Sequence, residues 1–507
     1  MNDPSRRRQT MPPRPARGER ASRRRSAALA RATGIGVALV SAAALLTPAA
    51  AADDGAGDSS ARGAGDWLAS QVTGRRVYDE LRHFQRLADE NGGSRAAGEP
   101  GEAATAALVA DRLRAGGYRV TVQSVPITYV AFDTEEATET SPGGGALKVL
   151  MTRYAPSTPA GGLTAPVAAM DASRTGCTVA DYPAERFDGA LALVARTSAC
   201  PLAQQEKAAA DAGARALLVW QPTPSPEHIW RYQAPATGFR LPVASVTQKA
   251  AEQLADRAAA GRVELHLTLR ARRMARFSQN VLAETSGGRP DRVVMMGAHL
   301  DSVTEGAGMN DNATAAAAVL QTALRLAPRQ GQVTQKVRFA FWGAEELQSV
   351  GSASYLSRLS EAERRRIRVL LNGELLGSPN DVRRVWRGAS PGSDAVSALF
   401  QDWFTRRGLP FDTVPSTSLG SDHLVFDEAG IAVGGLDAGL RAVKTEEEQA
   451  RYGGRAGQLY DPCYHQPCDD LGNVNARALG QNAPALAYAL GYAAHAEPAA
   501  DGTFRTP

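Results

Sequence analysis

The sequence predicts an α/β fold with a mostly parallel central sheet, helices on both faces and an inserted, smaller β-rich α/β module. In the C-terminal half, short apolar runs alternate with polar residues and helical stretches, which is typical of strands buried between layers of helices. Four runs carry this pattern: 292–296, 336–342, 368–371 and 429–434. Between 143 and 273 the pattern changes to Pro- and Gly-rich turns with short strands, which indicates a separate module.

The first 52 residues have the features of a secretory signal peptide. Ten arginines occur in this segment, with an apolar run over 35–46 and small residues up to Ala52. The apolar run has 12 residues, whereas a membrane-spanning helix needs roughly 20, so a membrane anchor is the weaker alternative. We therefore predict a signal peptide over 1–52 and a secreted, extracellular protein without membrane attachment once that peptide is removed.

A Gly-, Ala- and Asp-rich segment over 53–65 follows and is predicted as a linker. Helical periodicity appears over 78–88 and 102–115, and alternation over 118–129 predicts a strand. The resulting domain assignment is one domain over 66–142 and 274–507, interrupted by the module over 143–273.

Composition and charge exclude some partners. Hydrophobic residues make up 43% and charged residues 22% of the chain, as in ordinary globular proteins. The formal charge of +4 comes from the N-terminal arginines, because the residues after Ala52 hold 47 basic and 51 acidic side chains. A nucleic-acid partner therefore has no electrostatic support.

The four cysteines form two sequence-local pairs. Cys463 and Cys468 are 5 residues apart and Cys177 and Cys200 are 23 apart, so each pair can close a loop in an oxidising compartment. Four buried thiols are the alternative. A thiolate metal site is disfavoured because neither pair has C-x₂-C spacing.

Residues able to bind metal follow several of the predicted strands. In an open α/β sheet, ligands bind beyond the carboxyl ends of the strands, so we expect these residues to meet there. They are His299, Asp301, Asp311, Glu345, Glu346, Glu374 and His465. Imidazole and carboxylate together suit zinc, and one carboxylate can bridge two ions. A lone histidine is more often a packed or surface residue, but three of the seven histidines lie in such segments: His299, His423 and His465.

As a set, these motifs resemble those of the secreted bacterial co-catalytic di-zinc aminopeptidases. The motifs are His299-x-Asp301 with Asp311, Glu345-Glu346, Ser421-Asp422-His423 and Cys463-Tyr464-His465-x-x-Cys468-Asp469. The module over 143–273 is similar to the protease-associated domain inserted in many of these enzymes, and Cys177 and Cys200 match its disulfide. The resemblance thus implies a zinc exopeptidase-like catalytic domain with an inserted protease-associated domain.

The resemblance also implies a ligand set for two zinc ions. His299 and Glu374 would hold one ion, Glu346 and His465 the other, and Asp311 would bridge the two ions. The peptide bond between Asp311 and Asn312 would be cis. One zinc per chain is the alternative, because the family usually has Asp where this chain has Glu374.

Further residues receive roles from the same resemblance. Glu345 would be the general base that takes a proton from the attacking water, and Tyr464 would stabilise the oxyanion. Asp301 is suited to accept the ring N–H of His299 and fix its tautomer. Asp422 and His423 are expected to orient the pocket, or to serve the structure alone. A second departure lies just before these two, because Gly420 stands where relatives often carry an arginine.

We expect a secreted, monomeric metallo-aminopeptidase that hydrolyses N-terminal bonds of peptides or proteins. A single-zinc glutaminyl cyclase-like enzyme is one alternative, although the retained His299 argues against it. A carboxypeptidase of similar fold is another. A metal-free binding protein is disfavoured, because Glu345 and Tyr464 are needed only if water is activated.

Overall fold

The computed structural model describes residues 54–171, 173–235, 238–497, 499 and 504–505. The predicted signal peptide over 1–52 lies outside these residues. Within the described chain, no helix combines the length and the apolar character that crossing a bilayer requires.

The central sheet is mostly parallel, as predicted. Strand β9 (Arg289–His299) lies between β10 (Gln335–Trp342) and β11 (Ile367–Glu374), and both neighbours run parallel to it. Strand β14 (Ala432–Asp437) continues the parallel set beside β11. The outer strands are β12 (Arg384–Arg387) and β13 (Asp412–Pro415) on one side and β8 (Glu264–Glu284) on the other.

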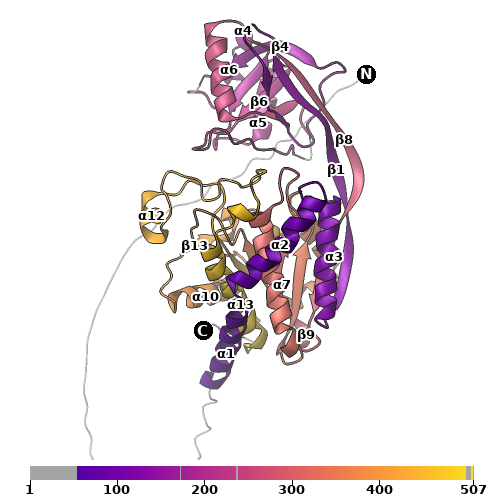
Figure 1. The fold of residues 1–507 in the computed structure, drawn as a ribbon, viewed down its shortest axis with the longest axis vertical. Helices are drawn as coiled ribbons and strands as arrows, with labels where there is room; N and C mark the ends of the chain where they lie inside the picture. The colour runs from indigo at the N-terminus through magenta and orange to yellow at the C-terminus, as the bar shows by residue number, and fades with distance from the viewer. Residues whose placement is uncertain (1–53, 172, 236–237, 498, 500–503, 506–507) are drawn as a thin grey trace, which may run out of the picture. The chain divides into compact units, whose positions relative to one another are not determined.

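Helices cover both faces of this sheet, which confirms the predicted fold class (Figure 1). Alternate residues of β9 show the two faces: Val294 and Met296 belong to one buried core, and Val293 and Met295 to another. The first core includes residues of α2 (Gly74–Glu90), α3 (Pro100–Ala115), α7 (Thr314–Leu326), α10 (Ser393–Thr405) and α13 (Ala476–His495). The second includes residues of α8 (Val350–Ser357) and α11 (Asp422–Glu428). The same part of the chain, which contains the central sheet, also has the short helices α9 (Glu361–Arg364) and α12 (Glu446–Tyr452).

The segment expected to be a linker over 53–65 is instead helical from Asp54 onward. Helix α1 spans Asp54–Gln71 and packs along α13. Its small residues permit a close approach, since a Cβ placed on Gly65 would lie 2.8 Å from a ring carbon of Tyr488. A composition that suggests flexibility in the sequence therefore serves helix packing in the structure.

The inserted module has a core of its own, formed by residues from Ala137 to Leu269. Its elements are β2 (Ala146–Leu147), β3 (Leu150–Met151), β4 (Leu163–Ala169), α4 (Ala184–Phe187), β5 (Leu191–Ala195), α5 (Leu202–Asp211), β6 (Ala216–Trp220), β7 (Val243–Ser245) and α6 (Gln248–Ala260). Its four strands β4 to β7 are consecutive neighbours, and the pairs among them are parallel.

Two long antiparallel strands lead into and out of the module. Strand β1 (Arg119–Glu139) runs ten residues beyond its predicted end at 129 and pairs with β8 along nearly its whole length. Because β8 spans 264–284, it crosses the predicted domain boundary at 273 without a break. The connection is therefore a hydrogen-bonded ribbon, whose backbone groups are paired, rather than a loop.

Candidate metal centre

The predicted ligands come together at the carboxyl edge of the parallel strands. His299 is the last residue of β9 and Glu374 the last of β11, the strand beside it. Glu345 and Glu346 follow β10, on the other side of β9. The sheet order thus places one histidine between acids from both neighbouring strands.

Asp311 faces both histidines of this cluster. Its Oδ1 lies 3.4 Å from Nε2 of His299, and its Oδ2 lies 3.0 Å from Nε2 of His465. Oε2 of Glu374 is 3.4 Å from His299 Nε2, and Oε2 of Glu346 is 3.1 Å from His465 Nε2. Three groups of possible ligand atoms result among the described residues: His299 with Asp311 and Glu374, His465 with Asp311 and Glu346, and His299 with Glu345 and Glu346. The first two groups share only the carboxylate of Asp311. The peptide bond between Asp311 and Asn312 is cis, which confirms that prediction.

The tautomer of His299 is fixed by a backbone carbonyl. Its Nδ1 donates to the main-chain oxygen of Asp301 at 3.0 Å, so in the neutral ring the lone pair of Nε2 faces the carboxylates. The carboxylate of Asp301, expected to make this contact, lies 3.6 Å from Nδ1. It accepts instead from the backbone N–H groups of Glu345 and Glu346 at 3.0 and 3.1 Å, and so holds the glutamate pair in place.

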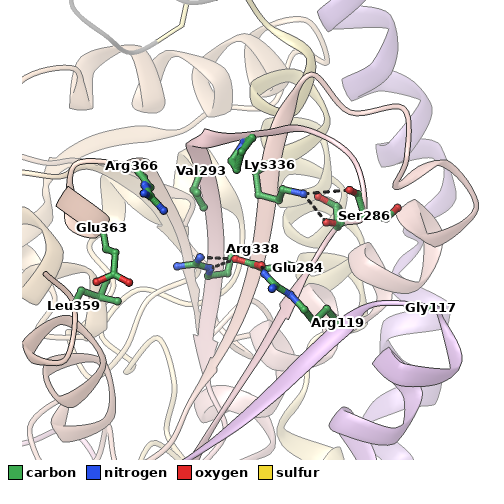
Figure 2. A pocket seen from close by; sticks show the side chains of 12 residues that line it. Gly117, Arg119, Glu284, Ser286, Val293, Lys336, Arg338, Leu359, Glu363 and Arg366 are labelled. Atoms are coloured by element: carbon green, nitrogen blue, oxygen red, sulfur yellow. Dashed lines mark hydrogen bonds and ion pairs between the residues drawn. The ribbon is translucent and has the colours of Figure 1, made fainter.

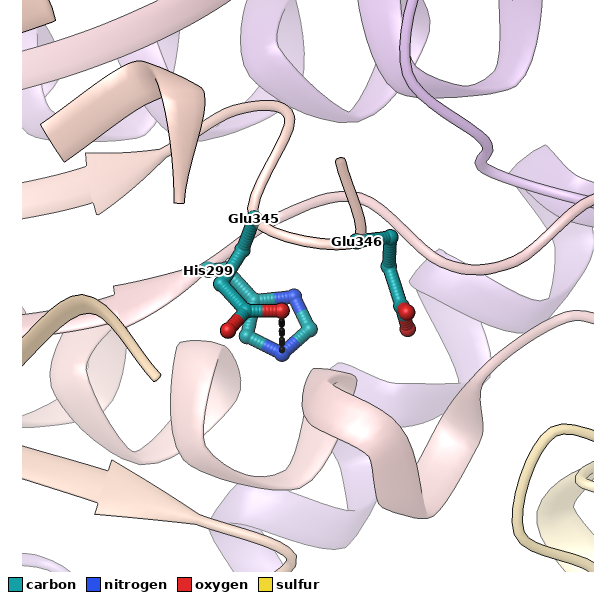
Figure 3. A group of neighbouring side chains, drawn as sticks. All are labelled: His299, Glu345 and Glu346. Carbon is teal, nitrogen blue, oxygen red and sulfur yellow. Dashed lines mark ion pairs between the residues drawn. The ribbon is translucent and has the colours of Figure 1, made fainter. Parts of the chain in front are cut away.

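The two adjacent glutamates point in different directions. Figure 3 shows the carboxylate of Glu345 over the His299 ring and that of Glu346 directed away from it. Glu345 Oε2 is 3.8 Å from His299 Nε2, while Glu346 reaches His465. Burial raises the pKa of Glu345 well above its usual range; the positive form of His299 opposes this rise and the charge of Asp422 adds to it. A carboxylate in this environment accepts a proton more readily than an exposed one.

The donor set fits metal cations. Asp311, Glu345, Glu346 and Glu374 place four carboxylates around two imidazoles, and Oε1 of Glu346 is buried with no hydrogen-bond partner within the described chain. Burial alone disfavours protonation of His465, yet the charges of Glu346 and Asp311 raise its pKa well above its usual range. Buried carboxylates without enough donors are stabilised by bound cations, and histidine with carboxylate is the ligand chemistry of zinc.

Glu374 reaches the ligand position despite its extra methylene. Its Oε2 faces His299, and its Oε1 accepts a hydrogen bond from the hydroxyl of Ser421. Burial raises its pKa, and His299 opposes that rise. At Gly420, an added Cβ would meet no described atom within 4 Å, so the position of the missing arginine is open space.

The remaining predicted residues lie around this centre. The ring of Tyr464 stacks on that of His465 with centroids 3.9 Å apart, inside the loop closed by the Cys463–Cys468 disulfide. Oδ1 of Asp422 accepts from the hydroxyl of Ser352 at 2.6 Å. His423 packs on Trp386 with centroids 4.4 Å apart and is absent from the ligand groups found among the described residues.

The second predicted pair, Cys177 and Cys200, is also bonded. No cysteine of the described chain is free, so the alternative of four buried thiols is excluded.

Sequence reasoning missed a buried cation beneath the centre. The side chain of Arg95 is fully buried and donates to the carbonyls of Leu300, Ala307 and Gly308, in the loop between His299 and Asp311. Burial lowers its pKa to about 10, and the charge of Asp301 opposes this, so Arg95 stays cationic at neutral pH. A single arginine after Ser94 carries no sequence signal of this role.

Asp469 is a second missed residue. Its carboxylate accepts from the backbone N–H groups of Asn310 and Asp311, at 2.8 and 3.0 Å. It follows Cys468 directly, so the disulfide loop that carries His465 also fixes the backbone of Asp311. Only its place in the Cys-Asp motif pointed to it.

We expect Arg95→Met to lower the free energy of unfolding by about 3 kcal/mol or more, because a buried charge network loses its cation and three carbonyls lose their donor. Urea unfolding followed by circular dichroism measures this change. Arg114→Met is the matched control, since Arg114 makes a surface ion pair with Asp111 and its loss should cost roughly 0.5 kcal/mol or less. Equal effects of the two substitutions would contradict the role of Arg95.

The cavity of about 450 Å³ in Figure 2 contains none of the predicted site residues. Its lining includes Arg119, Glu284, Lys336 and Arg338, at the end of the sheet opposite the ligand-bearing strand ends. Arg338 pairs with Glu284, and Lys336 donates to the carbonyl of Thr285 at 2.9 Å. The chemistry of the molecule is therefore concentrated at the other edge.

Comparison with known proteins agrees with this geometry. The model of peptidase family M28 matches residues 280–490, and the PA domain model matches 163–254. An aminopeptidase of Pseudomonas aeruginosa is 34% identical over 444 residues, which cover 81% of this chain and 79% of that protein. A probable lipoprotein aminopeptidase of Mycobacterium tuberculosis is 35% identical over 440 residues, 84% of this chain and 85% of that protein. The structure of a zinc aminopeptidase from Bacillus subtilis has the same fold, with a TM-score of 0.66 and 23% identity over 85% of this chain and 98% of that one.

Proposed function

Because this chain belongs to peptidase family M28, we propose that it is a secreted aminopeptidase that hydrolyses N-terminal peptide bonds with two zinc ions and a glutamate base. Membership confirms the resemblance drawn from the motifs, including the inserted PA domain. The chain is therefore a zinc-dependent hydrolase of the aminopeptidase class. We keep 66–142 with 274–507 as its catalytic domain and 143–273 as the full extent of the PA domain.

The observation that carries the two-ion proposal is the position of Asp311 between two histidines. Each of its oxygens faces one imidazole, and each imidazole has its own second carboxylate. His299 and Glu374 would hold one ion and His465 and Glu346 the other, with Asp311 shared. When bound, such ions polarise a carbonyl and make water more acidic, which is the chemistry that peptide hydrolysis needs.

Glu345 is the proposed general base. Its Oε2 lies 3.8 Å from His299 Nε2, and it can form a group of possible ligands with His299 and Glu346. We assign it to proton transfer because the two groups that contain Asp311 already supply three ligands to each ion. It would take a proton from the attacking water and pass a proton to the nitrogen of the leaving peptide. The hydroxyl of Tyr464 would donate to the oxygen that gains negative charge as the carbonyl is attacked.

An excess of acid at the centre favours a substrate with a positive end. Glu374 and Asp422 are both fully or almost fully buried, and burial raises the pKa of Asp422 to about 8. A free N-terminal ammonium group supplies the positive charge and donors that such carboxylates lack. Recognition of the substrate amine by these acids is therefore part of the proposal.

Export to an oxidising compartment is the last part of the proposal. Both disulfides of the described chain are local, and disulfides persist mainly in secreted and extracellular proteins.

The function is tested with leucine anilide, a glutaminyl peptide and a C-terminally amidated peptide, each with and without a chelator. We expect leucine release from the anilide and loss of the N-terminal residue from the amidated peptide, both abolished by the chelator and restored by zinc. Cyclisation of the glutaminyl peptide without hydrolysis of the others would refute an aminopeptidase. Removal of C-terminal residues alone would indicate a carboxypeptidase.

We expect Glu374→Asp to weaken binding of one zinc ion by about 10- to 100-fold, although relatives usually carry Asp there. In this chain the longer side chain spans from Ser421 to His299, and one methylene less withdraws the carboxylate by about 1.5 Å. Zinc per chain, measured after dialysis against graded free-zinc buffers, tests this. Unchanged stoichiometry at every zinc concentration would show that the shorter carboxylate still reaches the ion, and unchanged stoichiometry in Glu374→Ala as well would show that Glu374 is not a ligand.

A further inference from the structure

A second cavity, of about 340 Å³, lies beside the segment that carries His465. Arg196, Trp230 and Tyr232 of the PA domain contribute to its lining, together with Arg441 and Leu459 of the catalytic domain. None of these residues belongs to the proposed metal centre.

Backbone contacts tie both sides of this cavity to the catalytic segment. The carbonyls of Leu440 and Ala442, on either side of Arg441, accept from the N–H groups of Asp461 and Tyr460 at 2.7 and 2.9 Å. On the other side, Nε2 of Gln466 donates to the carbonyl of Ile229, next to Trp230, at 2.8 Å. The lining residue Leu459 thus lies two residues before Asp461, and the charge of Arg441 acts on Tyr464, so the cavity lies near the segment that carries Tyr464 and His465.

Two arginines give this cavity a positive charge: Arg196 is half-buried and Arg441 is exposed. Burial and the nearby charge of Arg441 both lower the pKa of the Arg196 guanidinium. Neither Arg196 nor Arg441 takes part in an ion pair with an acid among the described residues, unlike Arg231 and Arg384. Two arginines in the lining of one cavity are the features of a site for an anion that also accepts hydrogen bonds.

The proposed metal centre and the neighbouring cavity suit opposite ends of a peptide. The substrate amine is proposed to meet the acids of the centre, whereas Arg196 and Arg441 line the cavity. A short peptide is a dipolar ligand that matches this arrangement, with an ammonium group at one end and a carboxylate at the other. We propose that Arg196 and Arg441 bind the C-terminal carboxylate of short peptides, so that the enzyme prefers small peptides with a free C-terminus over longer or amidated ones.

This inference rests on the proposed function, and it sets the substrate class of the same site. A guanidinium group holds a carboxylate through two parallel hydrogen bonds, so two arginines suffice for a strong contact. Each extended residue spans about 3.3 to 3.6 Å, so the preference should peak at one peptide length. Because the carboxylate is far from the bond that breaks, its binding should act mainly on KM and less on kcat.

The test compares leucyl peptides of three to six residues, each as the free acid and as the C-terminal amide, with leucine anilide as a substrate that has no carboxylate. For wild-type enzyme we expect kcat/KM to be about tenfold higher for the acid than for the amide at the best length, mostly through KM. Arg441→Ala should remove this difference and leave anilide hydrolysis unchanged. Arg455→Ala is the matched control, because Arg455 is an exposed arginine of the same region that does not line the cavity.

Arg196→Ala provides a second variant, with its thermal midpoint measured because Arg196 also donates to Gln205. Equal rates for acid and amide at every length, or a preference that survives in both arginine variants, would overturn the inference. Failure of wild-type enzyme to hydrolyse leucine anilide would instead refute the proposed function, so the two failures are distinguishable.

Discussion

Glu345→Gln is expected to lower kcat for leucine anilide by about 10²- to 10⁴-fold, the usual contribution of a positioned general base. The substitution keeps the size of the side chain and removes only its capacity to take a proton. Since Glu345 lies outside the two groups that share Asp311, zinc content should stay at the wild-type value. Steady-state kinetics together with zinc analysis of the same samples measure both effects.

The control for this variant is Glu428→Gln, an exposed glutamate at the end of α11 that should leave kcat unchanged. Loss of zinc in Glu345→Gln would mean that this carboxylate is a ligand. Unchanged kcat would mean that another group accepts the proton, and Asp422 would be the next candidate, because its charge acts on Glu345.

The strand ends of the catalytic domain were predictable because two simple patterns coincide there. Fully buried parallel strands appear in the sequence as continuous apolar runs, and the polar residues just after them have to lie at one edge of the sheet. His299, Glu345 and Glu374 follow three such runs, and β10, β9 and β11 are neighbours in the sheet. No comparable pattern reveals Arg95, whose importance comes from three carbonyls more than 200 residues away in the sequence.

Other differences come from tertiary packing that overrides local composition. The Gly- and Ala-rich sequence of α1 looks flexible in isolation, but Gly65 lets the helix pack closely on Tyr488 of α13. The partner of the His299 ring is the carbonyl of Asp301 rather than its carboxylate, because that carboxylate is taken by two backbone amides of the following loop. Which of two nearby oxygens accepts a hydrogen bond depends on the other donors around them in the folded protein. The spacing of residues in the sequence does not show those donors.

Asp311→Ala is expected to have the second large effect, because in the described part of the chain Asp311 is the one carboxylate that pairs with both His299 and His465. Its loss removes a ligand atom from each group at once, so both zinc ions should bind more weakly, whereas His465→Ala should weaken mainly one. Since bound ions supply several kcal/mol of transition-state stabilisation, we expect kcat/KM to fall by about 10³-fold or more. Zinc per chain and kinetics are measured together for both variants.

Asp311 is buried, so a failure to fold has to be separated from a failure to bind metal. Asp311→Asn keeps the shape of the side chain and provides the second variant, and Asp256→Asn on α6 is an exposed control of equal charge change. Circular dichroism should give wild-type spectra for both asparagine variants, with zinc lost only from Asp311→Asn. Two tightly bound zinc ions in a folded Asp311→Asn protein would show that the two ligand groups do not depend on a shared carboxylate charge, and the bridged centre would then have to be abandoned in favour of two separate sites.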